Sequence, residues 1–158
     1  MIGGEFVRQE LATNSAAIDN VGGWRALGTI TKSQVDTHLF LRLQFPAGLD
    51  LTGCDSLLLE TSVPEGQRVS AQLLVILHEK DGSDYLAQTG RSLAAAGWSK
   101  TFVPINRFQL AGWSTDENAK LDLNNVDEIR IGWGGCFGTE GERIEFSVTP
   151  PQAAKESW

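Results

Sequence analysis

The chain has 158 residues, of which 41% are hydrophobic, and this size is typical of one globular domain with its own core. Its formal net charge of −7 argues against nucleic acid or an anionic membrane as a partner, because both need a basic surface. No apolar run approaches the roughly 20 residues that span a bilayer, and the opening MIGGEFVRQE lacks the basic-then-apolar order of a signal peptide.

Alternation of apolar and polar residues predicts β-strands along most of the chain. The segment from Glu10 to Trp24 is weakly patterned, and we expect it to mix an edge strand with a loop. The alternation is clearest in HLFLRLQF, residues 38–45, whose Leu and second Phe side chains face one way while His38, Phe40, Arg42 and Gln44 face the other. Further strands are expected at residues 56–63, 70–80, 84–90, 99–105, 127–133 and 142–148.

The segments between these strands have the composition of turns, for example VPEGQ, EKDGSD and GTEG. Short strands at this spacing, without a helical period, predict an all-β fold, an antiparallel two-sheet β-sandwich of the jelly-roll type. We expect residues 1–150 to form a single domain and residues 151–158 to be a tail or linker. The expected interior residues are Leu39, Leu41, Leu43, Ile129, Ile131, Ile144 and Phe146.

The two cysteines, Cys54 and Cys136, are too few for a disulfide framework and lack the spacing of a zinc site. Buried free thiols are the main expectation, because cysteine is often found in protein cores. A bridge between the two is the alternative if the protein is secreted.

Motifs of catalysis and nucleotide binding are absent from the sequence. The glycine-rich stretch GWGGCFG, residues 132–138, lacks the Lys-Ser/Thr of a P-loop and precedes a strand, not a helix. There is no GxSxG or HExxH motif, and His38 and His78 are the only imidazoles. Carboxylate pairs for glycosidase chemistry need a defined separation that a sequence does not show. We predict that the protein is not an enzyme, and keep an enzyme built on the sandwich as the third hypothesis.

The segment GWSKTFVPINRFQLAGWSTDENAKLDLNNVDEIRIGWGG, residues 97–135, resembles β-glucan-binding carbohydrate-binding modules of family 11 and related galactose-binding-like jelly rolls. The shared pattern is a Trp, a short strand ending in Pro, a Phe, a loop aromatic and then LDL-x-N-[IV]-D-x-I. Here it falls on Trp98, Pro104, Phe108, Trp113 and Leu121 to Ile129. The resemblance continues less sharply upstream and covers about two-thirds of the chain.

This resemblance implies a non-catalytic module that is attached to a polysaccharide-degrading enzyme and binds a glucan chain in a groove on the concave sheet. It implies a secreted or extracellular protein, a monomer, with no cofactor. The family's C-terminal strand usually carries an Asp that can serve a structural calcium, whereas this chain reads IEFSV. Glu145 is the nearest substitute, so a calcium site stays open.

Sugar rings stack on aromatic side chains while their hydroxyls need fixed polar partners, and this chain has five Trp and one Tyr. The loop aromatic of the family corresponds to Trp113 and the aromatic closing the next strand to Trp133. The candidate ligand-binding residues are Trp113, Trp133, Arg130, Glu128, Asp127, Tyr85, Asp81, Asp84, His38, Arg42, Gln44, His78 and Trp24.

The aromatic residues differ in what their surroundings predict. Trp113 lies in the polar loop LAGWSTDEN and is expected to be exposed. Trp133 shares strand parity with the core residue Ile131, which predicts burial, but its flanking glycines permit a bulge that would turn the ring outward. Our hypothesis is that Trp133 and Trp113 together form the stacking platform. Trp98 is expected to pack against the protein and Phe108 to lie in the core. A structural or protein-interaction domain is the alternative function.

Overall fold

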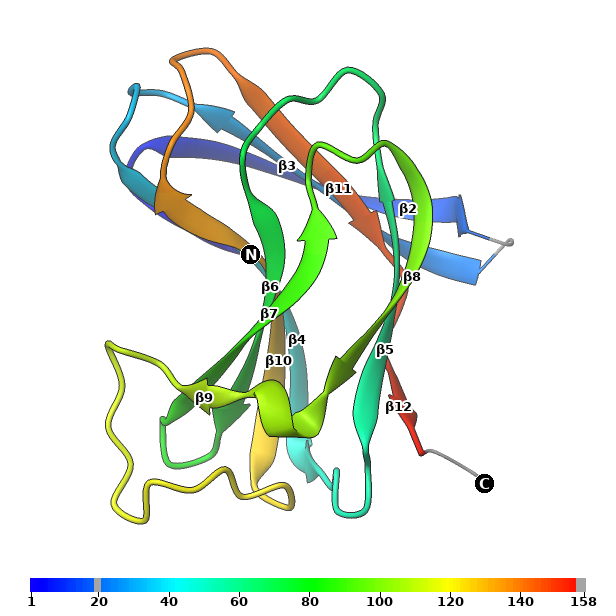
Figure 1. Cartoon of the computed structure of the whole chain (residues 1–158), viewed down its shortest axis with the longest axis vertical. Coiled ribbons are helices and arrows are strands. Elements are labelled where there is room, and N and C mark those ends of the chain that lie inside the picture. Colours follow the sequence, from blue (N-terminus) through cyan, green and yellow to red (C-terminus); the bar gives the residue numbers. More distant parts are fainter. Residues whose placement is uncertain (19–20, 156–158) are drawn as a thin grey trace.

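The computed structural model describes residues 1–18 and 21–155, which form two antiparallel β-sheets packed face to face (Figure 1). The predicted β-sandwich is therefore confirmed. The first sheet contains, in spatial order, β1 (Ile2–Gly3), β4 (Asp36–Leu49), β10 (Val126–Cys136), β6 (Gln72–Glu79), β7 (Asp84–Ser92) and β9 (Gln109–Leu110).

The second sheet contains, in spatial order, β12 (Gln152–Ala154), β5 (Ser56–Val63), β11 (Arg143–Val148), β3 (Val21–Ile30) and β2 (Val7–Ile18), with β8 (Gly97–Pro104) paired to β5. A single-turn 3-10 helix, η1 (Ile105–Arg107), links β8 to β9. Among the residues that the structure describes, no helix is long and apolar enough to cross a membrane.

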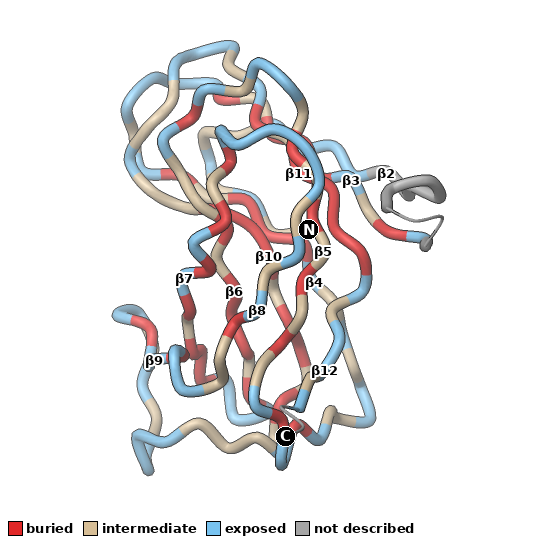
Figure 2. Tube along the Cα trace, turned by 45° about the vertical axis from the view of Figure 1, so that its right-hand side comes forward, coloured by how far each residue is buried: buried red, intermediate tan, exposed pale blue. Residues whose placement is uncertain are grey.

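The hydrophobic core lies between the two sheets, where buried residues alternate with more exposed ones along the strands (Figure 2). All the predicted interior residues are buried except Leu43, which is half-buried and packs against the core. Phe108 is buried as expected. Each fully buried Leu, Ile or Phe side chain stabilises the fold by about 1.5 to 3 kcal/mol relative to an exposed one, so this interior is the main source of stability.

The two ends of the chain contain more strand than the sequence pattern indicated. Within the segment from Glu10 to Trp24, residues 10–18 belong to β2, the expected edge strand, and residues 21–24 belong to β3, an interior strand that pairs with both β2 and β11. Residues 19 and 20 lie outside the described part. Within the predicted tail, Gln152–Ala154 pairs with β5, while residues 156–158 lie outside the described part. The domain boundary at residue 150 stays a prediction.

Strand β10 crosses the middle of the first sheet and holds most of the glycines of the GWGGCFG stretch. Its pairing with β4 is uninterrupted from Glu128 to Cys136, and the one irregularity falls between Val126 and Glu128. A Cβ atom on Gly132 would lie 1.9 Å from the carbonyl oxygen of Leu39, so only glycine fits this close approach of the two backbones. The glycines therefore allow close strand packing and do not form a bulge at Trp133.

Both cysteines are free, so the alternative of a disulfide is wrong for this structure. Cys54 is buried as expected, and its thiol contacts the backbone carbonyl of Ser56 at 2.9 Å. Cys136 is exposed at the end of β10, which contradicts the prediction that both thiols are buried.

Candidate functional site

The outer face of the first sheet carries a hollow of about 490 Å³ over β1, β4, β10, β6 and β7. Side chains of one face recur every second residue, and the strand register places them in rows across the sheet. Phe40, Gly132 and Leu74 form one row, and Arg42, Arg130 and Ile76 form the next. The lining residues are Ile2, Asp36, Thr37, His38, Phe40, Leu74, Ile76, Leu86, Trp113, Arg130, Gly134 and Gly135.

The floor of this hollow is open because its central strand carries glycines. Gly132 separates Phe40 of β4 from Leu74 of β6 in the strand pairing, and Gly134 and Gly135 of β10 line the hollow, so this part of the strand contributes no side chains to fill it. The result is a shallow, largely apolar trough, which suits a flat ligand that presents C–H groups.

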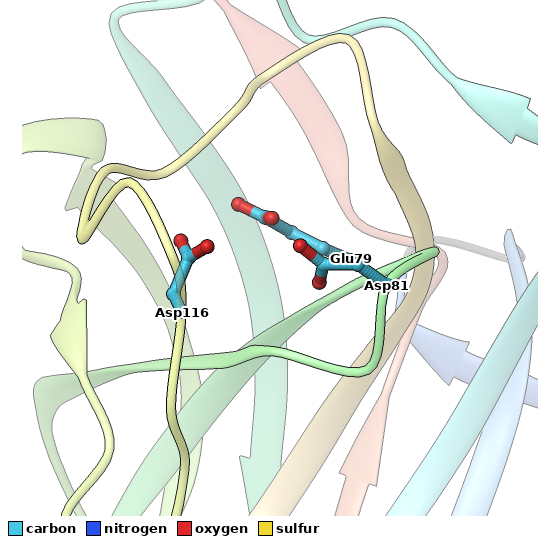
Figure 3. A group of neighbouring side chains, drawn as sticks. All are labelled: Glu79, Asp81 and Asp116. Carbon is cyan, nitrogen blue, oxygen red and sulfur yellow. The ribbon is translucent and has the colours of Figure 1, made fainter.

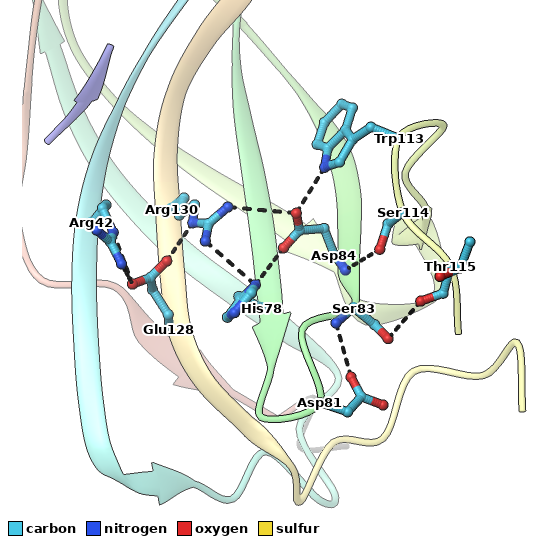
Figure 4. A network of polar contacts seen from close by, with 10 residues as sticks. All are labelled: Arg42, His78, Asp81, Ser83, Asp84, Trp113, Ser114, Thr115, Glu128 and Arg130. Atoms are coloured by element: carbon cyan, nitrogen blue, oxygen red, sulfur yellow. Dashed lines mark hydrogen bonds and ion pairs between the residues drawn. The ribbon is translucent and has the colours of Figure 1, made fainter. Parts of the chain in front are cut away.

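A network of charged side chains lies beside the trough (Figure 4). The buried carboxylate of Glu128 accepts hydrogen bonds from Arg42 Nε at 3.0 Å and Arg42 Nη2 at 2.7 Å. Its other oxygen accepts a hydrogen bond from Arg130 Nε. Because the two guanidinium groups hold this carboxylate from both sides, its charge is paired and the arginine side chains are fixed in place.

Asp84, at the start of β7, joins this network to the loop that follows β9. Its Oδ1 lies 2.6 Å from His78 Nδ1, and its Oδ2 lies 3.6 Å from Arg130 Nη1. The same Oδ2 accepts a hydrogen bond of 2.8 Å from Trp113 Nε1. The backbone N–H of Asp84 donates to Ser114 Oγ at 2.9 Å. These contacts hold the loop bearing Trp113 against the sheet.

Trp113 is 64% exposed, so its predicted exposure is confirmed. Its indole N–H is fixed by Asp84 while its ring borders the trough. An exposed indole that is already oriented loses little conformational entropy when a ligand stacks on it. The geometry therefore combines an aromatic surface, an apolar floor and oriented polar groups in one place.

The pairing of Glu128 makes the stability of the fold depend on acidity. Burial raises the pKa of Glu128, but the hydrogen bonds from Arg42 and Arg130 outweigh burial and hold it below the ordinary 4.5. A depressed folded-state pKa means that the stabilisation is fully present above pH 4.5 and is lost as the pH falls through the folded value. We expect the stability difference between wild type and Glu128→Gln to shrink in acid below pH 4.5.

This prediction is measured by urea unfolding of both proteins at pH 7 and at several values below pH 4.5. The difference between the two proteins isolates Glu128 from the other carboxyl groups. A difference in the free energy of unfolding that is the same at every pH would contradict the prediction.

A second hollow of about 630 Å³ adjoins the first and shares Leu86 with it. It lies over β6, β7 and β9 and is lined by side chains with amide and guanidinium groups, among them Gln72, Gln88, Gln109 and Arg107. Such groups donate hydrogen bonds to hydroxyls and accept them, apart from arginine, which only donates. The two hollows together offer an apolar trough followed by a hydrogen-bonding one.

Most of the predicted site residues are brought together on this outer face. His38, Arg42 and Gln44 of β4 share it with Glu128 and Arg130 of β10, and the pairing places Gln44 opposite Glu128. His78 and Asp84 face each other from β6 and β7. Asp81 is exposed in the turn between β6 and β7, and Asp127 is half-buried at the irregularity of β10. Their participation in ligand binding stays a prediction.

Three predicted aromatic contacts require correction. Trp133 is completely buried, because its strand continues without a bulge and its parity directs the ring into the core. Tyr85 is also buried and donates its hydroxyl to Asp116. Trp24 is half-buried on β3 of the second sheet, where it packs against the core away from the trough.

Trp98 departs from its expectation in the opposite direction, since it is 50% exposed on β8, with Lys100 Nζ 5.7 Å from its ring centroid. Phe102, four residues further along the strand and on the same face, is 56% exposed. Both therefore lie on the second sheet, separate from the residues around Trp113.

The apolar floor of the trough was missed by the sequence reasoning. Phe40 was assigned to the polar face of its strand, and Leu74 and Ile76 were given no role. The sequence did contain a signal. Phe40 is an apolar residue among polar ones on an outward face, and the strand with Leu74 and Ile76 is apolar on both faces. Either pattern indicates a surface that contacts something besides the core.

Glu145 of β11, the nearest substitute for the family's calcium-binding Asp, forms an ion pair with Arg25, whose Nε lies 3.3 Å from its Oε1. Calcium binding at this position stays open. Within the described residues, a different group has metal-binding geometry: Glu79, Asp81 and Asp116 each place one oxygen within 4.8 Å of the others (Figure 3).

Comparison with solved structures finds the same fold in carbohydrate-binding modules. A family 11 module of a cellulosomal cellulase of Clostridium thermocellum has a TM-score of 0.68 at 14% identity, covering 99% of this chain and 88% of that one. A family 11 module from Clostridium thermocellum, in complex with a β-1,3-1,4-mixed-linked tetrasaccharide, has a TM-score of 0.69 at 13% identity, covering 98% and 86%.

A family 30 module of a Clostridium thermocellum cellulosomal cellulase is more distant, with a TM-score of 0.55 at 9% identity and coverage of 96% and 87%. No family model matches the sequence, and no curated protein matches it. At these identities the similarity establishes the fold, which agrees with the architecture that the sequence predicted.

Proposed function

We propose that this protein is a non-catalytic carbohydrate-binding module that binds a polysaccharide chain along the outer face of its first sheet. The observation that carries the proposal is Trp113, an exposed indole oriented by Asp84 at the border of an apolar trough. A pyranose ring needs an aromatic plane for its C–H face and fixed polar groups for its hydroxyls. The trough offers the first, while Arg130 and the adjoining amide-lined hollow offer the second.

The ligand class that we propose is a β-glucan, and the solved module with a mixed-linked tetrasaccharide shares this fold. A β-linked glucan chain is extended and flat, which suits an open trough across several strands better than a closed pocket would. We further propose that the module is secreted as part of a larger protein, acts as a monomer and targets an attached glycoside hydrolase to its substrate.

Affinity electrophoresis against a panel of soluble polysaccharides tests this function. The panel includes mixed-linked β-1,3-1,4-glucan, a β-1,4-linked glucan derivative, xylan, mannan and an α-glucan. We expect retardation by the β-glucans and no release of reducing sugar from any of them. Migration unaffected by every polysaccharide would refute carbohydrate binding, and reproducible hydrolysis by the pure protein would refute the non-catalytic assignment.

A second candidate function, a protein-interaction surface, is favoured by one observation. Trp98 and Phe102 are half exposed on the outer face of β8, with Lys100 between them. Exposed aromatics on one face of a strand are typical of a contact surface. If this surface packs against an attached domain, substitution of Trp98 will weaken that contact and leave polysaccharide binding unchanged.

A further inference from the structure

The second hollow, over β6, β7 and β9, continues into a third one. The third hollow, of about 510 Å³, is lined by residues 68–72, Ser92 and Ala94, and it shares Gln72 with the second. Among the described residues that line these two hollows, none is Asp or Glu, although the chain has 20 acidic residues and a net charge of −7. Arg107 lines the second hollow and Arg68 the third. We call the lining of these two hollows the arginine surface.

The guanidinium group of Arg107 is available to a ligand. Arg107 ends η1, which leads into β9 at the edge of the first sheet (Figure 1). It is exposed, and its Nη1 donates a long hydrogen bond of 3.3 Å to the backbone carbonyl of Gln88. Within the described part of the chain, no carboxylate forms an ion pair with Arg107 or Arg68. Because a guanidinium has five N–H donors, Arg107 keeps most of them for another partner.

Arg91 adds a buried positive charge next to the arginine surface. It lies on β7 between Gly90, which lines the second hollow, and Ser92, which lines the third. Its guanidinium donates only to neutral groups, which are Thr61 Oγ1 at 2.8 Å and backbone carbonyls of the following segment. No described carboxylate forms an ion pair with it either. A buried charge is screened less than an exposed one, so Arg91 favours an anion at the neighbouring surface.

Gln72, at the start of β6, lines both hollows with its donor end unengaged. Its Oε1 accepts a hydrogen bond of 2.7 Å from the backbone N–H of Gly90. The acceptor half of this amide is therefore occupied, and its NH₂ group is left to donate. Arg107 and Gln72 thus both offer donors in the second hollow. An ionised carboxylate, which only accepts hydrogen bonds, matches such a set.

We infer that the arginine surface binds the carboxylate of an acidic sugar residue in the polysaccharide chain, and that Arg107 is its main partner. The planar fork of a guanidinium pairs with both oxygens of a carboxylate, which a single hydroxyl cannot reproduce. The amides of Gln88 and Gln109 in the same hollow are suited to the hydroxyls of that sugar. Because the second hollow adjoins the trough, this inference rests on the proposed function and narrows its ligand to glucan-like chains that carry uronic acid residues.

A β-glucan with part of its primary hydroxyls oxidised to carboxylates tests this inference against its unoxidised parent. We expect calorimetry at pH 7 and low salt to give about three- to tenfold tighter binding of the oxidised chain. In about 0.5 M NaCl this gain should disappear, because the screening length falls to about 4 Å. The net charge of −7 would by itself repel a polyanion, so the expected gain has the opposite sign to the background effect.

The outcomes separate this inference from the proposed function. If the parent glucan binds and the oxidised chain binds no more tightly at low salt, the arginine surface does not recognise a carboxylate, and the proposed function is unaffected. If neither chain binds, both are refuted. A sulfated β-glucan of equal charge density is the third probe, and a gain seen with sulfate but not with carboxylate would overturn the assignment to an acidic sugar.

Variants of Arg107 locate the carboxylate. Arg107→Gln removes the charge and keeps an amide, so the ratio of the affinities for oxidised and parent glucan should fall to one or below. Arg107→Lys keeps the charge without the fork and should retain part of the ratio. The control, Arg143→Gln, removes a positive charge from an exposed position at the start of β11 in the second sheet, and should keep the wild-type ratio. A folded Arg107→Gln protein with the wild-type ratio would overturn the inference.

Discussion

Replacing Trp113 with alanine is expected to weaken binding to a β-glucan about five- to hundredfold while leaving the protein folded, with only the small fall in melting temperature that follows from losing the hydrogen bond to Asp84. Stacking of a flat ring on an aromatic side chain contributes about 1 to 3 kcal/mol, as measured for nucleic acid bases, and this range converts to that loss of affinity. The ring is 64% exposed, so its removal opens no core cavity. Calorimetry with a soluble β-glucan, paired with a melting curve, measures both quantities.

Two further variants make the result specific. Trp113→Phe keeps an aromatic face but loses the hydrogen bond from Nε1 to Asp84, so it should retain more affinity than Trp113→Ala. Trp98→Ala removes an equally large ring that is 50% exposed on the second sheet, and it should bind like wild type. If Trp113→Ala stays folded and keeps full affinity for every glucan that wild type binds, the binding surface lies elsewhere.

The sequence was a good guide to what depends on local pattern. Alternation predicted the strands because each must bury one face, and β5 was predicted at the residues where it is found. The exposure of Trp113 followed from a polar loop that has no alternation to bury a ring. Strand β3 was missed because its sequence, VGGWRALGTI, contains several small residues that weaken the alternation, although tertiary packing makes it an interior strand.

Contacts between distant segments could not be predicted in the same way. Asp84 meets Arg130 and Trp113 because β6, β7, β10 and the loop after β9 come together, and no spacing along the chain encodes those distances. Tyr85 and Trp98 show the same limit: Tyr85 was a candidate ligand contact, but its ring is buried and its hydroxyl donates to Asp116. The side chain of Trp98 is on the face of β8 that points toward solvent and not into the core.

Replacing Trp133 with alanine is expected to reduce the free energy of unfolding by about 3 to 5 kcal/mol, the range typical of large buried aromatic residues. The ring is completely buried, it lies 5.6 Å from the Phe137 ring between centroids, and β10 holds it against the core. For a domain of this size the melting temperature should fall by about 6 to 20 °C. Urea unfolding at pH 7 measures the loss.

Variants of Trp133 also test whether this residue has a structural role or a binding role. Trp133 Nε1 is buried without a hydrogen-bond partner, so Trp133→Phe removes a polar group that costs free energy as well as part of the ring. We therefore expect Trp133→Phe to be clearly more stable than Trp133→Ala. Both variants should bind β-glucan with wild-type affinity at a temperature where they are folded, because the ring does not reach the trough. A stably folded Trp133→Ala protein that has lost glucan binding would contradict a purely structural role for this ring.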